Sequence, residues 1–374
     1  MNRIAQSQFF KFIPGLLATA FSLTICFCTL EFYIRNTQPK IDLYVLTGRI
    51  PGPNPMDSWA HIDAFSAYRG KHGQYSEGKS VNQFGFISTP KISVIKPKNT
   101  IRIIFLGGSS TAGTGWNLKD EETWPWLTVQ FLRKELNIKI DFINAALGGY
   151  SSFESYGRLW SRLRHFSPDF VILNHGWNEM YYFNSADNIV NWRTLKDGSW
   201  RLDRADDPII SYSPNFLDPL IRWSQLLTYF RLKFSSQIAG EVRSKTSINL
   251  ETSYNKKGLE IWRTNLKLIE ETCNIIGAKL FVIKQPTLIV ANLSLSEQKR
   301  CRYDFHGFDH NAHVDAYSKI YKIIDEEIER NFIIDATVLS GNPELFFDHV
   351  HPNTLGSFQL AQLVSRSLLR HLEN

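Results

Sequence analysis

From residue 101 onward, short apolar runs alternate with longer segments of mixed polarity. The strand-like runs are 101–106, 139–144, 169–174, "KLFVIKQP" and "FIIDA". The helix-like segments lie near 124–136, 152–166, 257–276, 312–330 and 354–372. Apolar strands that alternate with helices are typical of a parallel sheet covered on both faces. We therefore expect an α/β protein with a three-layer α/β/α sandwich.

Two segments interrupt this alternation. Residues 36–98 are dense in Gly and Pro and contain aromatics, so we expect a connector of short strands and turns that packs on the main domain. Residues 183–255 are rich in Trp, Asn, Asp, Ser and Arg and show no clear period. We interpret them as an insertion at the ligand-binding edge of the sheet, although a surface excursion unconnected with ligand is equally compatible. The main domain is expected to cover 99–374.

The first 35 residues predict a membrane anchor. Between Lys11 and Glu31 lie 19 uncharged residues, "FIPGLLATAFSLTICFCTL", which as a helix extend about 28 Å, close to the hydrocarbon thickness of a bilayer. Pro14 would fall in the first turn, where its missing N–H costs little. A cleaved signal peptide is the alternative, because Ala18-Thr19-Ala20 offers an A-x-A site. Cleavage there would leave an apolar run behind, so we favour an uncleaved signal anchor.

Charge gives limited information about orientation and partners. Arg3 and Lys11 precede the span and Arg35, Lys40 and Arg49 follow it, so the positive-inside count does not decide the topology. We adopt a short tail in the cytoplasm and a large extracytoplasmic domain, with the lipid bilayer as a partner. The net charge of +6 is spread along the chain without a basic block, and nucleic-acid-binding motifs do not occur. Nucleic acid is therefore not an expected partner.

Cysteine and histidine spacing leaves two alternatives open. Cys273 and Cys301 could form a disulfide in an oxidising compartment or remain two unrelated thiols. His306, His310 and His313 have spacings that could hold zinc. That stretch runs from a predicted loop into a helix, so a histidine loop that faces solvent or substrate is the preferred interpretation. We expect no metal and no cofactor.

The turn after the first strand-like run carries a serine. From Gly108 to Gly113 the spacing imitates the G-x-x-x-x-G of a phosphate loop, but Thr114 stands where a Lys must neutralise phosphate. The remaining feature is Ser109, at the carboxyl end of a strand in a tight turn. In open α/β sheets ligands bind at that edge.

Other turns offer partners for this serine. "FFDHVHPNTLG" places Asp348 and His351 together, so that an imidazole can take a hydroxyl proton while the carboxylate orients it. In "NAALGGYSS", Gly149 allows close backbone approach to a ligand. In "NHGWNEM", Asn178 could donate to a developing oxyanion. Each alone has a structural explanation, as a helix-entry histidine, a tight turn or a capping Asn. Their common position at strand ends favours one site.

This ordered set resembles the four sequence blocks of the SGNH/GDSL hydrolase family, over about residues 100 to 373. The blocks are Gly107-Gly108-Ser109, Asn144 with Gly149, Gly176-Trp177-Asn178-Glu179 and Asp348-His349-Val350-His351-Pro352. The resemblance implies a flavodoxin-like parallel sheet, with Ser109 as nucleophile, His351 as base and Asp348 orienting it. It also implies an oxyanion hole from the N–H groups of Ser109 and Gly149 and the side chain of Asn178. Gly108 and Glu179 depart from the family, where Asp is frequent at both positions.

Three functions follow as hypotheses. The first is a membrane-anchored serine esterase that forms an acyl-serine intermediate on an acyl-ester substrate, with O-deacetylation of an envelope polysaccharide as the specific expectation. The second is an O-acyltransferase that passes the same acyl group to a glycan hydroxyl instead of water. The third is a non-catalytic, anchored polysaccharide-binding module. The presence of Ser109, His351 and Asn178 together argues against the third, because binding alone does not need all three.

Overall fold

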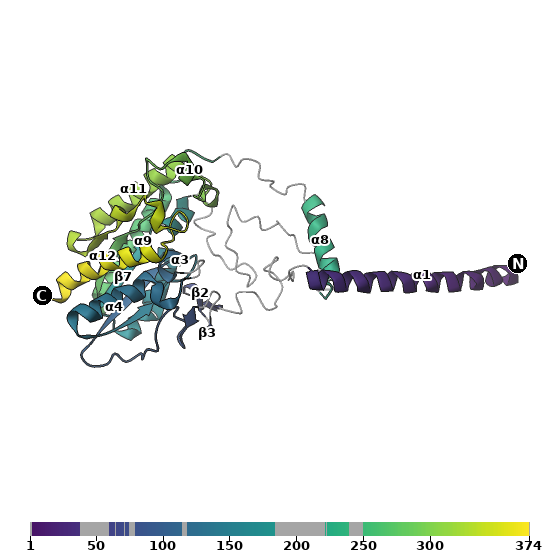
Figure 1. The fold of residues 1–374 in the computed structure, drawn as a ribbon, viewed down its shortest axis with the longest axis horizontal. Helices are drawn as coiled ribbons and strands as arrows, with labels where there is room; N and C mark the ends of the chain where they lie inside the picture. Colours follow the sequence, from purple (N-terminus) through teal and green to yellow (C-terminus); the bar gives the residue numbers. More distant parts are fainter. Residues whose placement is uncertain are drawn as a thin grey trace. The chain divides into compact units, whose positions relative to one another are not determined.

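The computed structural model describes residues 2–37, 60–63, 65–70, 72–74, 79–113, 118–183, 221, 223–238 and 250–373 (Figure 1). The first part of the predicted connector and most of the predicted insertion up to residue 220 therefore lie outside the described residues, as does Thr114. The chain divides into two compact units. One contains helices α1 and α8, and the other contains the sheet with its covering helices.

The first unit begins with a long helix. Helix α1 spans Asn2–Thr37, and helix α8 spans Gln225–Ile238. Pro14 lies inside α1 and not in its first turn, because the preceding residues contain no Gly or further Pro to stop a helix. The part Pro14–Thr37 is long and apolar enough to cross a membrane.

A five-stranded sheet forms the centre of the second unit. Its order is β6 (Lys139–Asn144), β5 (Thr100–Gly107), β7 (Phe170–His175), β8 (Lys279–Lys284) and β9 (Ile333–Asp335). Every neighbouring pair is parallel. The predicted parallel sheet is thus confirmed, and the direction of strand addition reverses between β5 and β7.

Side chains of β5 alternate between two buried clusters, one on each face of the sheet. Ile104 and Leu106 pack with residues from α5 (Ser152–Ser161), α9 (Lys257–Ile276) and α11 (His310–Glu327). Ile103 and Phe105 pack with residues from α4 (Trp124–Leu136) and α12 (Thr354–Leu372). The period of two follows from strand geometry. Helices on both faces confirm the predicted three-layer α/β/α sandwich.

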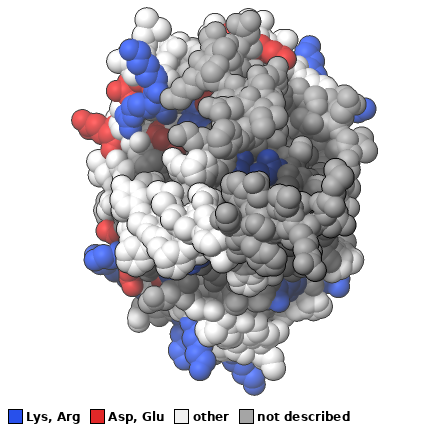
Figure 2. Space-filling model, turned by 90° about the vertical axis from the view of Figure 1, so that its right-hand side faces the viewer, with Lys and Arg blue, Asp and Glu red and all other residues white. Residues whose placement is uncertain are grey.

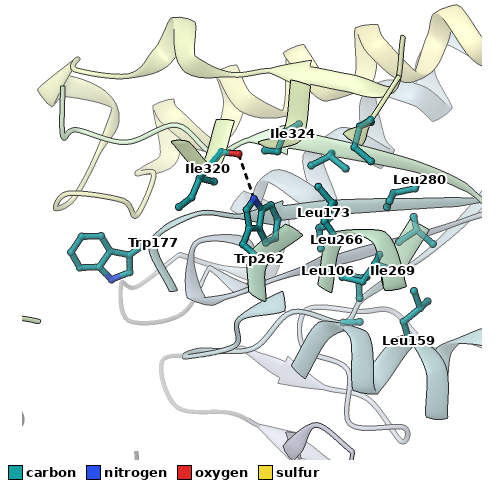
Figure 3. Close-up of a cluster of buried hydrophobic side chains, with 14 of the residues drawn as sticks. Leu106, Leu159, Leu173, Trp177, Trp262, Leu266, Ile269, Leu280, Ile320 and Ile324 are labelled. Carbon is teal, nitrogen blue, oxygen red and sulfur yellow. Dashed lines mark hydrogen bonds between the residues drawn. The ribbon is translucent and has the colours of Figure 1, made fainter. Parts of the chain in front are cut away.

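Trp262 lies at the centre of the first cluster (Figure 3). This α9 residue is fully buried, and its indole N–H donates to the carbonyl of Ile320 on α11 at 3.4 Å. Burial of an indole requires such an acceptor for its polar edge. The contact fixes α11 against α9 on this face of the sheet.

The predicted helices agree closely with those observed, with one informative difference. The segment predicted near 152–166 ends as an α-helix at Ser161 and continues as the 3₁₀-helix η4 (Leu163–Phe166). Side chains three residues apart share one face of a 3₁₀-helix. Leu163 and Phe166 therefore both enter the core, and they are 0% and 5% exposed.

Short antiparallel strands precede the sheet. They are β1 (Ala60–Asp63) with β2 (Ala67–Gly70), and β3 (Gly73–Gln74) with β4 (Ser80–Val81). The remaining short elements are α3 (Ser109–Ala112), α10 (Leu295–Gln298), η3 (Asp120–Glu122), η5 (Trp177–Phe183), η6 (Tyr303–Phe305), η7 (Arg330–Phe332), η8 (Thr337–Leu339) and η9 (Pro343–Leu345).

Residues 79–99 pack on the sheet through buried side chains. Phe86 and Ile92 belong to the cluster around α9. The buried guanidinium of Arg158 on α5 donates to the carbonyls of Gly85 and Ala145, both at 2.8 Å. The connector is thereby joined to the turn that follows β6.

Charged side chains are dispersed on the face drawn in Figure 2. Lys and Arg lie at several separate places there, with Asp and Glu between some of them. Among the described residues of this face, cationic side chains do not gather into one large basic patch. This pattern matches the even spread of charge along the chain.

Candidate active site

The turns after three neighbouring strands meet at the carboxyl edge of the sheet. Ser109 follows β5 as the first residue of α3, Gly149 follows β6, and Asn178 follows β7 within η5. Strands β5 and β7 flank the point at which strand order reverses. In open α/β sheets this switch point opens a crevice in which ligands bind.

Ser109 stands at the end of a continuous hydrogen-bonded chain. Its Oγ lies 2.7 Å from Nε2 of His351. Nδ1 of the same imidazole lies 2.8 Å from Oδ2 and 3.0 Å from Oδ1 of Asp348. The structure thus brings these three residues together across 242 positions of sequence. In this arrangement the imidazole can take the serine proton while the carboxylate orients the ring.

The environment of Asp348 favours its ionised form. Burial opposes ionisation, but the hydrogen bond from His351 and those from backbone amides outweigh it, so that the pKa of Asp348 lies well below its ordinary range. Oδ1 accepts the amides of Val350 and His351, both at 2.9 Å. An ionised carboxylate only accepts hydrogen bonds, so the proton of the neutral His351 ring resides on Nδ1. Nε2 is then left as the acceptor that faces Ser109.

The neighbouring hydroxyl of Ser110 has a different role. Ser110 is 5% exposed, and its Oγ accepts a hydrogen bond from Nε2 of Gln285 at 3.0 Å. Oε1 of Gln285 accepts the backbone N–H of Trp177 at 2.8 Å. Gln285 therefore joins the turn after β5 to the turn after β7. The sequence analysis did not identify Gln285. It directly follows β8, so its position at the carboxyl end of a strand, the same signal that identified Ser109, could have identified it.

The side chain of Asn178 lies between the turns after β5 and β6. Its Nδ2 donates to the carbonyl of Tyr150 at 2.7 Å, which leaves the second amide hydrogen to point elsewhere. A Cβ at Gly108 would lie 2.5 Å from this nitrogen, so the absence of a side chain at that position allows the approach. Gly149 has a φ of +78°, a left-handed conformation that glycine adopts without strain. Ser109, Gly149 and Asn178 line one cavity.

Glu179, in η5 after β7, forms hydrogen bonds with Ser152, which follows the turn after β6. Its carboxyl oxygens accept the backbone N–H of Ser152 at 2.7 Å and the hydroxyl of Ser152 at 2.6 Å. Ser152 Oγ in turn accepts from Asn265 Nδ2 at 2.9 Å. Burial raises the pKa of Glu179 to about 8 against these hydrogen bonds. The sequence marked this position only as a departure from a family pattern, and its role in joining two turns was missed.

The cavity above these groups has a volume of about 500 Å³. One wall is aromatic, from Trp177, Tyr181, Phe305 and Phe347, and Arg300 and Arg302 also line it. Arg300 is held by Glu297 at 2.7 Å and by the carbonyl of Phe346 at 2.9 Å. The cavity is thus apolar on one side and reaches the Ser109 hydroxyl on another, as small-molecule sites commonly do.

The three histidines considered as zinc ligands do not converge. Nδ1 of His306 lies 3.1 Å from Nε2 of His313, whereas Nδ1 of His310 faces the hydroxyl of Tyr303 at 2.7 Å. Burial lowers the pKa of His313 to about 4, so this ring is neutral at pH 7. The rings of His306 and His313 pack on Trp177. Within the described residues, no group of three or more His, Cys, Asp or Glu side chains could hold a metal ion.

The two cysteines of the sheet-containing unit are free thiols in the structure. Cys273 is fully buried in the cluster around α9, where burial raises its pKa to about 12. A thiol in such surroundings acts as a small apolar side chain.

Comparison with solved structures finds distant likenesses, two of which are to proteins named as esterases. The crystal structure of TesA matches 71% of this chain and 97% of its own at 14% identity, with a TM-score of 0.39. The psychrotrophic esterase EstA from Pseudoalteromonas sp. matches 74% of this chain and 100% of its own at 16% identity and a TM-score of 0.38. The acetylxylan esterase Axe2 from Geobacillus stearothermophilus matches 73% and 95% at 11% identity and 0.38. No protein-family model and no curated protein matches the chain.

Proposed function

We propose that this protein is a membrane-anchored serine esterase that hydrolyses an acyl ester through an acyl-serine intermediate. The observation that carries the proposal is the 2.7 Å contact between Ser109 Oγ and His351 Nε2, backed by Asp348 on the far side of the imidazole. Three of the four sequence blocks lie in turns at one edge of the sheet, and the fourth supplies Asp348 and His351 from the loop before α12, which supports the same proposal. Neither a metal nor a cofactor is needed for this chemistry.

The first half of the reaction follows from the proton positions. As Ser109 Oγ attacks the ester carbonyl carbon, its proton passes to Nε2 of His351, and the resulting imidazolium is stabilised by the ionised Asp348. The carbonyl π electrons move to oxygen and form a tetrahedral oxyanion. In our proposal this oxygen receives hydrogen bonds from the backbone N–H groups of Ser109 and Gly149 and from the second N–H of Asn178.

The second half regenerates the enzyme. Collapse of the oxyanion breaks the bond to the alcohol, which leaves with the proton from His351, and an acyl-Ser109 ester remains. Water then gives a proton to Nε2 while its oxygen attacks the acyl carbon. The carboxylic acid departs as Ser109 Oγ recovers the proton. Because Asn178 is held by the carbonyl of Tyr150, its amide does not need to reorganise in either half.

For the substrate we propose an O-acylated polysaccharide of the cell envelope, with acetyl as the group removed. Trp177, Tyr181 and Phe305 offer flat apolar faces beside the nucleophile, which suit the apolar faces of sugar rings. A cavity of about 500 Å³ has room for a short acyl group with one or two sugar units. A substrate with a long fatty chain is not needed to fill it.

We further propose that α1 crosses the membrane once and that the catalytic unit is extracytoplasmic. Side chains such as Leu16, Phe21 and Leu23 are 65–68% exposed, as expected for groups that face lipid. The hydroxyls of Thr19 and Thr29 donate to the carbonyls four residues earlier, at 2.9 and 2.8 Å. Their polar groups are thus satisfied within the helix, without water.

Labelling with a fluorophosphonate probe tests the catalytic proposal. The wild-type chain and the Ser110→Ala variant should label, whereas Ser109→Ala should not, because only the Ser109 hydroxyl faces His351 and Ser110 is bonded to Gln285. Both substitutions remove one hydroxyl from adjacent positions, so Ser110→Ala is a matched control. A screen of acetylated glycans then tests the substrate. Labelling of Ser109→Ala at the wild-type rate would refute the assignment of Ser109 as the nucleophile. If neither the wild-type chain nor the variants were labelled, the result would favour a non-catalytic binding module.

A further inference from the structure

Helix α8 carries an exposed apolar stripe at helical spacing. Leu227 and Phe230, three residues apart on one face of α8, are 38% and 42% exposed, and Trp223, in the turn just before the helix, is 72% exposed. Leu226 and Thr228 on other faces are buried. The segment 221–238 contains Arg222, Arg231 and Lys233 but no acidic residue. An apolar face together with basic side chains is typical of a helix that lies in a membrane interface.

A carboxylate of the anchor helix holds the start of α8. Oε2 of Glu31 accepts the hydroxyl of Ser224 at 2.7 Å and the amide of Leu226 at 2.8 Å, and Oε1 accepts the amide of Gln225 at 2.8 Å. These bonds satisfy amides of the first turn, which have no partner within the helix. A negative charge is also favourable at a helix amino terminus. Glu31 therefore acts as a cap supplied by a segment about 190 residues away.

A second side chain of α1 strengthens this joint. Arg35 donates to Glu31 Oε1 at 2.6 Å and to the carbonyl of Trp223, also at 2.6 Å. The junction thus binds both a backbone carbonyl and backbone amides at the beginning of α8. In Figure 1, α8 lies beside the carboxyl-terminal end of α1 and runs across the direction of α1.

The position of Glu31 along α1 sets the depth of this junction. The uncharged stretch ends at Leu30, so in a bilayer Glu31 lies where hydrocarbon gives way to headgroups. Phe32 and Tyr33, which follow it, are 71% and 60% exposed. Trp223, whose backbone carbonyl accepts a hydrogen bond from Arg35, is 72% exposed as well, and aromatic residues are enriched at membrane interfaces.

We propose that α8 is an interfacial helix whose Leu227 and Phe230 face, together with Trp223 in the turn before it, inserts into the headgroup region of the same bilayer that α1 crosses. The inference rests on the membrane anchor proposed above. Its ligand is a lipid surface, and the basic side chains of the segment favour anionic headgroups. The chain then contacts the membrane through two helices far apart in sequence. One is α1 at its amino terminus, and the other is α8, within the segment that joins β7 to α9.

Photocrosslinking in the full-length protein tests this inference. The photoreactive residue p-benzoylphenylalanine is placed singly at Leu227, at Phe230, at Leu23 within α1, or at Val338 in η8. Val338 is 73% exposed, so it controls for exposure alone. Each variant is reconstituted in vesicles of phosphatidylethanolamine and phosphatidylglycerol, irradiated, and analysed for lipid adducts by mass spectrometry. We expect adduct yields at Leu227 and Phe230 that match the yield at Leu23 and exceed the Val338 background severalfold.

The outcomes separate this inference from the anchor itself. Lipid adducts at Leu23 combined with only background or protein adducts at Leu227 and Phe230 would overturn the interfacial helix and leave the anchor in place. Background yield at Leu23 as well would overturn both. The additional change Glu31→Ala should lower the yield at Phe230 and leave that at Leu23 unchanged. Equal yields at Phe230 with and without Glu31 would contradict the proposed joint.

Discussion

Asn178→Ala separates catalysis from structural support at one residue. In the structure the amide is 8% exposed, lines the cavity and makes one hydrogen bond, to the carbonyl of Tyr150. In the proposed mechanism its other N–H reaches the oxyanion, which is present only near the transition state. The substitution removes both interactions, but each affects a different measurement.

The two effects differ in size. Loss of a neutral, buried hydrogen bond to Tyr150 costs about 1 kcal/mol of folding stability, which lowers the melting temperature by about 2–4 °C in a domain of this size. Loss of one oxyanion donor raises the activation barrier by about 2.7–4 kcal/mol, or a hundredfold to a thousandfold in kcat. Because the oxyanion is absent from the ground state, KM should change little.

The assay measures kcat, KM and melting temperature of the full chain with 4-nitrophenyl acetate. Asn265→Ala is the matched control. Asn265 is also 8% exposed and its amide makes one buried hydrogen bond, to Ser152 Oγ, but it does not line the cavity. It should lower the melting temperature by a similar amount and leave kcat within a few-fold of wild type. If Asn178→Ala had a normal kcat and a decrease in melting temperature like that of the control, the assignment of Asn178 to the oxyanion hole would be wrong.

Three further predictions concern the orienting carboxylate, the buried glutamate and the anchor. Asp348→Asn should lower kcat about ten-thousandfold, because an amide cannot hold the proton on His351 Nδ1 as a carboxylate does; a loss of less than about tenfold in steady-state kinetics would contradict that role. The pKa of Glu179 is about 8 in the folded chain, whereas that of a free glutamate carboxyl is 4.5, so the contribution of Glu179 to stability is present below pH 4.5 and is lost as the pH rises to about 8. Denaturant unfolding of Glu179→Gln should therefore show a weaker fall of stability over that pH window, and an unchanged slope would argue against a protonated Glu179. After carbonate washing the protein should stay in the membrane fraction with its full amino terminus, and a soluble form that begins near Phe21 would instead indicate cleavage after Ala20.

Local pattern was sufficient to predict most of the sheet-containing unit. The helices at 124–136, 257–276 and 354–372 have the predicted bounds, because apolar periodicity, Pro125 in a first turn and Gly277 in a left-handed cap are all local signals. Pro14 misled the placement of the first helix, since a proline suited to a first turn is also tolerated inside a long helix.

The contacts that hold the turns together could not be predicted in the same way. Gln285 bonds Trp177 across 108 positions, and Glu179 bonds Ser152 across 27. A polar residue at the end of a strand shows that it lies near the ligand edge, but not which backbone group it meets. The same limit applies to Glu31, whose partners in α8 lie outside any local window.

These contacts give the candidate site its rigidity. Gln285 joins the turns after β5 and β7, Glu179 joins those after β6 and β7, and the Asn178 amide bonds the carbonyl of Tyr150. Preorganised donors stabilise a developing charge because they do not have to reorient as it forms. None of these bonds involves α1 or α8. Substitutions at Leu227 or Phe230 of α8 should therefore leave the hydrolysis of a small soluble ester unchanged.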